Sequence, residues 1–168
     1  MPDLHSTKVL GKAQKSALFL VVPEAEVLLD AVRGMPGVAL LEPAHISLGY
    51  PWVPDPDVDR VRAACAQVRP HHVALRGPEL FVQDVRQRTV VHALLSDESV
   101  PRRLADLLDA PLRTPHLSIA RVRKNGDVAE VVDAIRHLLP LPVLLDTLEL
   151  TVRTTAGWQT VDQVRLGG

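Results

Sequence analysis

EPAHISLGYP (residues 42–51) and TPHLSIAR (residues 114–121) carry the same short pattern, and this pattern decides the fold. Each copy reads histidine, apolar residue, serine, apolar residue, and a proline stands just upstream. In a β-strand, residues two apart point to the same face. Each copy therefore predicts a strand that directs a histidine and a hydroxyl to one face and two aliphatic side chains to the other.

Two such strands facing one cavity would supply two imidazoles and two hydroxyls. We predict His45 and His116 as general acid and base, because histidine has a reference pKa of about 6.5, close to working pH. We predict that Ser47 and Ser118 bind the non-bridging oxygens of a phosphate group. This chemistry requires neither a metal nor a cofactor, so we expect neither.

Two other uses of histidine and serine fit these motifs poorly. A metal site is disfavoured because neither motif has an Asp or Glu at ligand spacing, and no H-E-x-x-H occurs. A Ser-His-Asp hydrolase is disfavoured because there is no G-x-S-x-G, and each serine shares a strand face with its histidine. The single cysteine, Cys65, lies in a helical pattern that predicts inert, buried packing.

Composition narrows the class of protein. A chain of 168 residues favours one domain, and an aromatic content of 3% predicts a core of Leu, Val and Ala. The net charge of −1 lacks the basic surplus of proteins that grip long nucleic acids, so a nucleotide ligand should be small. A lone cysteine and the absence of about 20 consecutive apolar residues predict a cytoplasmic protein without a membrane partner. We expect a monomer.

Apolar periodicity predicts an α+β fold. Helices are predicted over residues 23–33 and from residues 57, 99 and 127 onward, with Asp57 and Asp127 as N-caps. Because groups of strands alternate with helices, the order favours α+β over a doubly wound parallel sheet. The two motif copies suggest two related lobes whose sheets meet at a cleft. Residues 1–15 are predicted to be a flexible tail before a single domain over residues 16–168. Strands are predicted over residues 17–22, 38–41, 44–50, 72–76, 79–85, 89–95, 116–122, 143–153 and 158–166.

Further candidates surround the motifs. Tyr50, Trp52 and Phe81 are the candidate platforms for stacking a base, and Tyr50 and Trp52, which follow the first motif, could line the mouth of the cleft. Arg113 precedes the second motif and could neutralise phosphate charge, since Arg suits bidentate phosphate contact. Strand parity puts Arg121 on the face opposite His116, which makes Arg113 the better candidate. Four further histidines lack the motif context and are predicted to lie at the surface or at strand edges: His71, His72, His92 and His137.

At these residues the chain resembles the 2H phosphoesterase superfamily, within its bacterial branch of 2′-5′ RNA ligase-like and cyclic phosphodiesterase proteins. The hallmark of this family is two His-x-Thr/Ser-x motifs, and the resemblance extends from about residue 16 to 166. It implies a bilobal α+β fold: two pseudo-symmetric lobes of antiparallel sheet, flanked by helices, around a central cleft. It also implies a metal-independent site with His45 and His116 as acid and base and with Ser47 and Ser118 on the phosphate.

The resemblance implies a hydrolase, namely a 2H-type cyclic phosphodiesterase. Its expected substrate is a small cyclic phosphate or a 2′-5′ or 2′,3′-cyclic nucleotide phosphodiester. Two alternatives stay open: a catalytically silent nucleotide-binding module, and an RNA end-processing or 2′-5′ RNA ligase-like protein that acts on RNA ends. The sequence does not assign which histidine is the base, because the two motifs are nearly symmetric.

Overall fold

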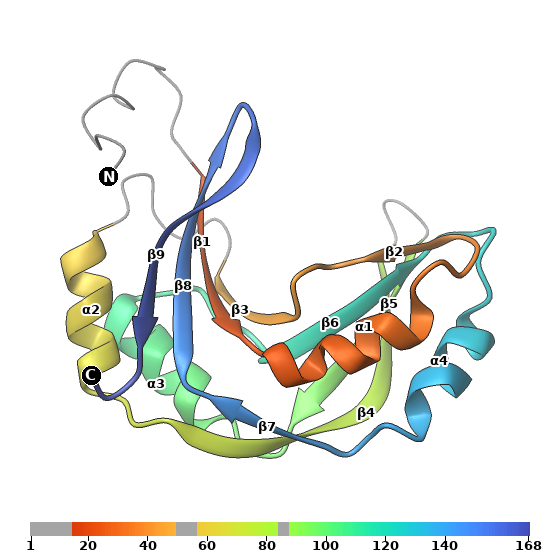
Figure 1. Ribbon diagram of the computed structural model, residues 1–168, viewed down its shortest axis with the longest axis horizontal. Helices are drawn as coiled ribbons and strands as arrows, with labels where there is room; N and C mark the ends of the chain where they lie inside the picture. Colours follow the sequence, from red (N-terminus) through yellow and green to blue (C-terminus); the bar gives the residue numbers. More distant parts are fainter. Residues whose placement is uncertain (1–14, 50–56, 84–87) are drawn as a thin grey trace.

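The computed structural model describes residues 15–49, 57–83 and 88–168 (Figure 1). Within these ranges, nine strands form one sheet in which all paired strands are antiparallel. Helices are packed against this sheet, which confirms the predicted α+β class. The strands are β1 (Ser16–Val21), β2 (Val38–Leu40), β3 (His45–Gly49), β4 (His71–Gln83), β5 (Arg88–Leu95), β6 (His116–Val122), β7 (Leu141–Leu145), β8 (Thr147–Thr154) and β9 (Gly157–Arg165). The helices are the 3-10 turn η2 (Pro23–Ala25), α1 (Glu26–Val32), α2 (Val58–Ala66), α3 (Ser99–Leu108) and α4 (Val128–Arg136).

The two predicted lobes are the two halves of this single sheet. The strand order is β7-β4-β5-β6-β3-β1-β8-β9, with β2 added to β6. The two motif strands, β6 and β3, are therefore neighbours at the centre, and each half extends outward from one of them. Figure 1 shows β1, β8 and β9 rising on one side and β4, β5 and β6 on the other.

The helices cover the two halves in pairs. Helices α2 and α3 contact each other and the half that contains β3, β8 and β9, whereas α1 and α4 contact each other and the half that contains β4, β5 and β6. Along the chain, α1 follows β1 and α3 follows β5. Each of these two helices thus covers the half opposite to the strand that precedes it. None of the described helices is long and apolar enough to span a membrane.

The core is aliphatic, as the low aromatic content predicts. All of the largest fully buried side chains are Leu or Ile, and they include Ile46 and Leu117 from the two motifs. Cys65 is buried in the same core, and burial raises the pKa of its thiol to about 11. A thiol with such a raised pKa is rarely ionised, which fits the predicted packing role.

Two predicted helix starts are confirmed in detail. The carboxylate of Asp57 accepts a hydrogen bond from the Arg60 backbone N–H at 3.1 Å, at the start of α2. The carboxylate of Asp127 accepts one from the Glu130 N–H, also at 3.1 Å, at the start of α4. Each cap satisfies one of the N–H groups that a helix leaves unpaired in its first turn.

The predicted single strand over residues 143–153 is wrong. It is two strands, β7 and β8, which separate at Asp146. Strand β7 pairs with β4 in one half, whereas β8 pairs with β1 and β9 in the other. Asp146 stabilises this crossing because its carboxylate accepts a hydrogen bond from Thr147 Oγ1 at 2.8 Å and pairs with Arg165. By contrast, the two strands predicted over residues 72–76 and 79–85 are, up to the last described residue Gln83, one strand, β4, with an irregularity after Arg76.

Candidate functional site

The two motifs meet at the centre of the sheet. Ile46 of β3 is paired with Leu117 of β6 in antiparallel register. The two strands run in opposite directions, so the residue pairs next to Ile46 and Leu117 are His45 with Ser118 and Ser47 with His116. Ile46 and Leu117 are fully buried in the core, so the histidines and serines share the opposite face.

Each motif histidine is oriented by a backbone carbonyl two residues upstream. Nδ1 of His45 lies 2.6 Å from the Pro43 carbonyl oxygen, and Nδ1 of His116 lies 2.8 Å from the Thr114 carbonyl oxygen. A carbonyl can only accept a hydrogen bond, so Nδ1 carries the proton in both rings. Nε2 is then the nitrogen that each ring has free for acid–base chemistry.

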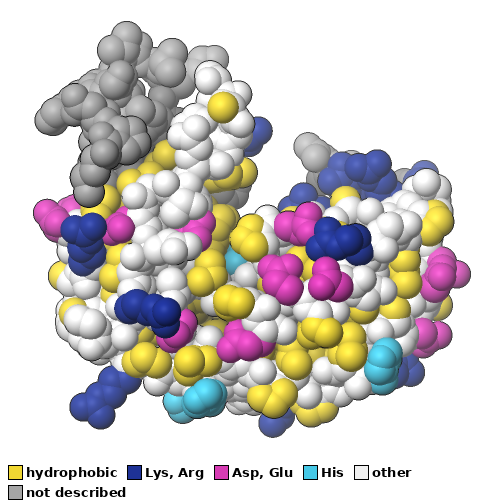
Figure 2. Space-filling view, viewed as in Figure 1, with side chains coloured by type: hydrophobic (Ala, Val, Ile, Leu, Met, Phe, Trp, Pro, Cys, Tyr) yellow, Lys and Arg dark blue, Asp and Glu magenta, His cyan; other side chains and the backbone are white. Residues whose placement is uncertain are grey.

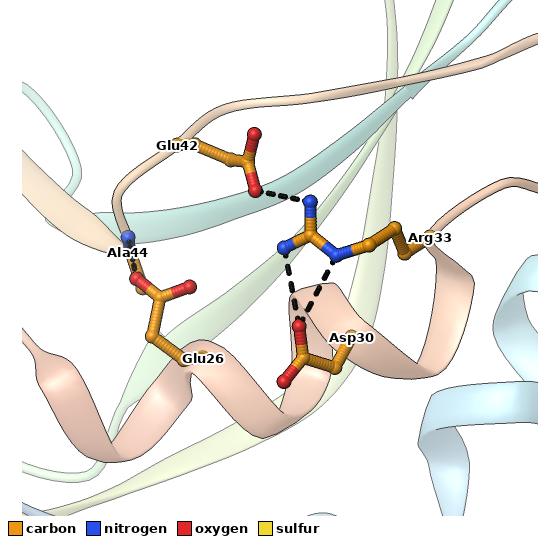
Figure 3. Close-up of polar contacts among 5 residues, drawn as sticks. All are labelled: Glu26, Asp30, Arg33, Glu42 and Ala44. Atoms are coloured by element: carbon orange, nitrogen blue, oxygen red, sulfur yellow. Dashed lines mark hydrogen bonds and ion pairs between the residues drawn. The ribbon is translucent and has the colours of Figure 1, made fainter.

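The loop in front of His45 is fastened to helix α1 (Figure 3). The Ala44 N–H donates to Glu26 Oε1 at 2.6 Å, and the Ala44 carbonyl accepts from the Val22 N–H at 3.0 Å. Arg33 at the end of the same helix pairs with Glu42 in the loop, with its Nη1 2.5 Å from the carboxylate. These contacts hold the segment that presents the carbonyl to the His45 ring.

A cavity of about 820 Å³ opens over three of the four motif side chains, and His116 is not among the residues that line it. Figure 2 shows the surface hollowed between the two halves of the sheet. His45, Ser47 and Ser118 lie in its wall. The cavity extends mainly toward β1, β8 and β9, so its largest part lies on the His45 side. Its other lining residues are Phe19, Val21, Leu40, Leu41, Glu42, Pro43, Arg121, Glu149, Thr151, Arg153, Trp158 and Thr160.

Arg121 lies in the cavity wall, and the prediction that it lies on the opposite face is wrong. Val91 of β5 pairs with Ala120, but the next residue, His92, pairs with Ser118, so β6 contains one extra residue. Such a β-bulge turns the residues beyond it to the other face. Nε of Arg121 is buried and has no hydrogen-bond partner among the described residues. A buried guanidinium nitrogen with an open donor suits an anionic ligand.

Aromatic rings flank both motif histidines. On one side, the Phe19 ring lies 4.2 Å from the His45 ring between centroids, and the Trp158 ring lies 6.5 Å from Phe19. On the other side, the His92 ring lies 5.1 Å from the His116 ring. Sequence reasoning did not name Phe19 or Trp158 as site residues and assigned His92 to the surface or a strand edge. Their roles depend on strand register, which alternation within one strand does not give.

Burial controls the charge of His45. It lowers the pKa of His45 below the ordinary value of 6.5, and the Pro43 carbonyl and the carboxylates of Glu149 and Glu26 oppose this only in part. Taking an imidazolium out of water is unfavourable, so the neutral ring is favoured. His45 is therefore suited to accept a proton near neutral pH.

The remaining candidates lie elsewhere. Arg113 is exposed, is not among the residues that line the cavity, and accepts a hydrogen bond on its carbonyl from Arg102 Nη1 at 3.4 Å. Tyr50 and Trp52 lie outside the described residues. Within the part of the chain that the structure describes, no group of three or more His, Cys, Asp or Glu side chains is placed to hold a metal ion.

The chain matches one protein family in sequence and several solved structures in fold. A sequence model of the 2′-5′ RNA ligase superfamily matches residues 21–157. Among solved structures, a phosphoesterase is similar with 10% sequence identity, 91% of this chain and 98% of that chain covered, and a TM-score of 0.56. Escherichia coli LigT is similar in its complex with NADP+ (9% identity, 93% and 99% covered, TM-score 0.55) and with 3′-AMP (9%, 92% and 99%, 0.54). A search of curated protein sequences finds no match.

Replacement of Glu26 by Ala should destabilise the protein by about 1–3 kcal/mol, because it leaves the Ala44 N–H without its acceptor. Urea unfolding measures this change. The Glu26→Gln variant keeps an amide oxygen at the same place and is the matched control, expected to retain most of the stability. Equal losses in both variants would show that the carboxylate acts through its charge and not as the acceptor for Ala44.

Proposed function

Because the chain belongs to the 2′-5′ RNA ligase superfamily, which confirms the 2H phosphoesterase resemblance, we propose that it is a metal-independent phosphoesterase. It hydrolyses a small cyclic phosphate or a 2′-5′ or 2′,3′-cyclic nucleotide phosphodiester. His45 and His116 are its general base and acid, and Ser47 and Ser118 bind the phosphate.

One observation carries this proposal: the antiparallel pairing of the two motifs at Ile46 and Leu117. It supports a phosphate between the two imidazoles, because each histidine then faces the serine of the other motif across the central strand pair. A phosphoryl group that is attacked in line needs one catalytic group on each side of phosphorus. Two histidines from neighbouring antiparallel strands meet this need without any further element.

We assign the base role to His45 and the acid role to His116. Burial favours the neutral form of His45, as a base requires. In the proposed step, Nε2 of His45 accepts a proton from water while the water oxygen bonds to phosphorus. The bond from phosphorus to one ribose oxygen breaks, and Nε2 of His116 donates its proton to that oxygen. A cyclic diester and water thus become a phosphomonoester with a free hydroxyl.

Three donors would stabilise the charge on the non-bridging oxygens. The hydroxyls of Ser47 and Ser118 border the cavity, and the Arg121 guanidinium has a buried donor without a partner among the described residues. Preorganised donors of this kind stabilise the transition state more than the ground state, because negative charge accumulates on the oxygens they face.

The cavity supports a nucleoside as the remainder of the substrate. A volume of about 820 Å³ is in the range of small-molecule sites. Phe19 and Trp158 in its wall offer ring faces on which a base can stack, and Thr151 and Thr160 offer hydroxyls. The structurally similar LigT has been crystallised with NADP+ and with 3′-AMP, which agrees with a nucleotide ligand.

Replacement of either motif histidine should remove activity without unfolding the protein. His45→Ala and His116→Ala should each lower kcat/KM for a 2′,3′-cyclic nucleotide by about 10²–10⁴, the usual contribution of a general acid or base. His137→Ala, at the exposed end of α4, is the control and should keep full activity. Circular dichroism checks the fold.

Two results would contradict this assignment. One is full activity in either motif variant. The other is activity that EDTA abolishes and zinc restores, since the proposed mechanism uses no metal. Stabilisation of the protein by nucleotides in a thermal-shift assay, without any product, would instead support the binding-module alternative.

Arg121 and Arg113 can be compared directly as phosphate ligands. Arg121→Met should lower kcat/KM by about 10- to 100-fold, because a hydrogen bond to a charged group contributes about 1.5–3 kcal/mol. Arg113→Met should change it little, since Arg113 is exposed and outside the cavity wall. Steady-state kinetics on both variants measures this difference. A larger loss of kcat/KM in Arg113→Met than in Arg121→Met would instead support Arg113, the residue predicted from the sequence, as the phosphate ligand.

The pH dependence of kcat/KM should reflect the lowered pKa of the buried His45. Since burial lowers the pKa of His45 below 6.5, the ring becomes protonated, and the base is lost, only below that pH. The acid limb of kcat/KM should therefore lie below pH 6.5. Phe19→Ser, which lets water reach the ring, should move this limb upward, and the apolar control Phe19→Leu should leave it in place. If the acid limb does not move in Phe19→Ser, the limb reports the titration of a group other than His45.

A further inference from the structure

His92 occupies, in its half of the sheet, the position that Phe19 occupies in the other. Phe19 of β1 pairs in register with Ser47, and His92 of β5 pairs with Ser118. The two serines are themselves equivalent about the Ile46–Leu117 pair. The residues Phe19 and His92 are thus related by the same pseudo-twofold axis as the two motifs.

Ring contacts follow the same symmetry. The Phe19 ring contacts the ring of His45, which is the motif histidine two residues before its serine partner, with centroids 4.2 Å apart. The His92 ring contacts His116 in the same way, with centroids 5.1 Å apart and the rings at 66°. Each motif histidine therefore has one aromatic neighbour from the flanking strand.

The equivalence extends one strand further out. Glu149 of β8 pairs with Phe19, and Glu79 of β4 pairs with His92. Across the sheet, the two rows read Glu, aromatic ring, Ser. They differ at one position, where Phe19 cannot bind a proton and His92 can. The pseudo-symmetry of the site is broken at this ring.

The charged and titratable groups that face His92 are few among the described residues. They are Glu79 on β4, His116 and Arg121 on β6, and Arg76 on β4, which pairs with Leu94 on the same face. On β5 itself, its neighbours on the same face, Val90 and Leu94, are apolar, and the Phe81 ring lies 5.3 Å away.

Two buried side-chain nitrogens in the described part of the chain make no hydrogen bond, and the strand register puts both residues on the same face of the sheet. They are Nδ1 of His92 and Nε of Arg121. Buried polar atoms are rarely left without partners. Two of them on one face of the sheet, where His92 pairs with Ser118, support an acceptor that a bound molecule supplies.

We propose that His92 is a proton-accepting residue of the anion site: His92, packed against His116, takes up a proton when a phosphate group binds beside Ser118. This inference rests on the proposed function in placing the phosphate beside Ser118. It does not require that the substrate be turned over.

The physical reason is mutual repulsion of two imidazolium rings. Burial, and then the charge of His116, lower the pKa of His92, whereas the Val90 carbonyl and Glu79 act in the opposite direction. A bound anion offsets the repulsion and so raises the proton affinity of the pair. By linkage, the affinity for the anion must then rise as pH falls through this range. Phe19 gives His45 no such partner.

Calorimetry of sulfate binding tests the proposal, because sulfate is a tetrahedral anion that does not itself titrate near neutral pH. Titrations near pH 6 in two buffers of different ionisation enthalpy give the number of protons taken up on binding. Wild-type protein should take up more protons than His92→Phe, with a difference approaching one. Its sulfate affinity should also rise more steeply on acidification, by up to about tenfold more per pH unit.

Three variants make the test specific. His92→Phe keeps an aromatic ring against His116 and removes only the proton site. Phe19→His is the mirror variant and should increase proton uptake by giving His45 a titratable neighbour. His137→Phe, at the exposed end of α4, should behave as wild type.

Equal proton uptake in wild type and His92→Phe would overturn the proposal, and so would the absence of sulfate binding to wild type. If His92→Phe does not fold, an unchanged uptake in Phe19→His overturns it instead. A protein that binds sulfate with the predicted uptake but hydrolyses no cyclic nucleotide would support the role of His92 and contradict the proposed function.

Discussion

The pairing of β3 with β6 is the constraint on which the rest of this structure depends. A single register, with Ile46 opposite Leu117, sends both aliphatic pairs into the core and both histidine–serine pairs to the other face. A slip of one residue would reverse this on one strand and bury a histidine in an aliphatic core. The hydrophobic pattern of two short strands therefore fixes the geometry of the site.

Much of this could be predicted from the sequence, because it depends on local patterns. Alternation in the two motifs gave the strands and the shared face of each histidine and serine, and aspartates before helical patterns gave two N-caps. The α+β class and the 2H family followed from the order of elements and from the motif pair, and the structure and the family match confirm both.

The residues that sequence reasoning missed depend on relations between strands. Arg121 lines the cavity because a β-bulge in β6 turns the residues after it to the other face of the sheet. The apolar pattern of the sequence does not reveal such a bulge. His92 lies beside His116 only because β5 pairs with β6 in this register. The break at Asp146 was hidden for a similar reason, since apolar residues continue from β7 into β8 while the two strands pair with different partners.

The arrangement of α1 and α3 has a mechanical consequence. Each of these helices leaves a strand of one half and packs on the other, so the halves are interlocked and not merely adjacent. A hinge between two independent bodies would have to remove from each half one of the two helices that cover it. The depth of the central groove is therefore set by the fold itself, and adaptation to ligands of different size is left to the rims, where β8 and β9 turn back on each other.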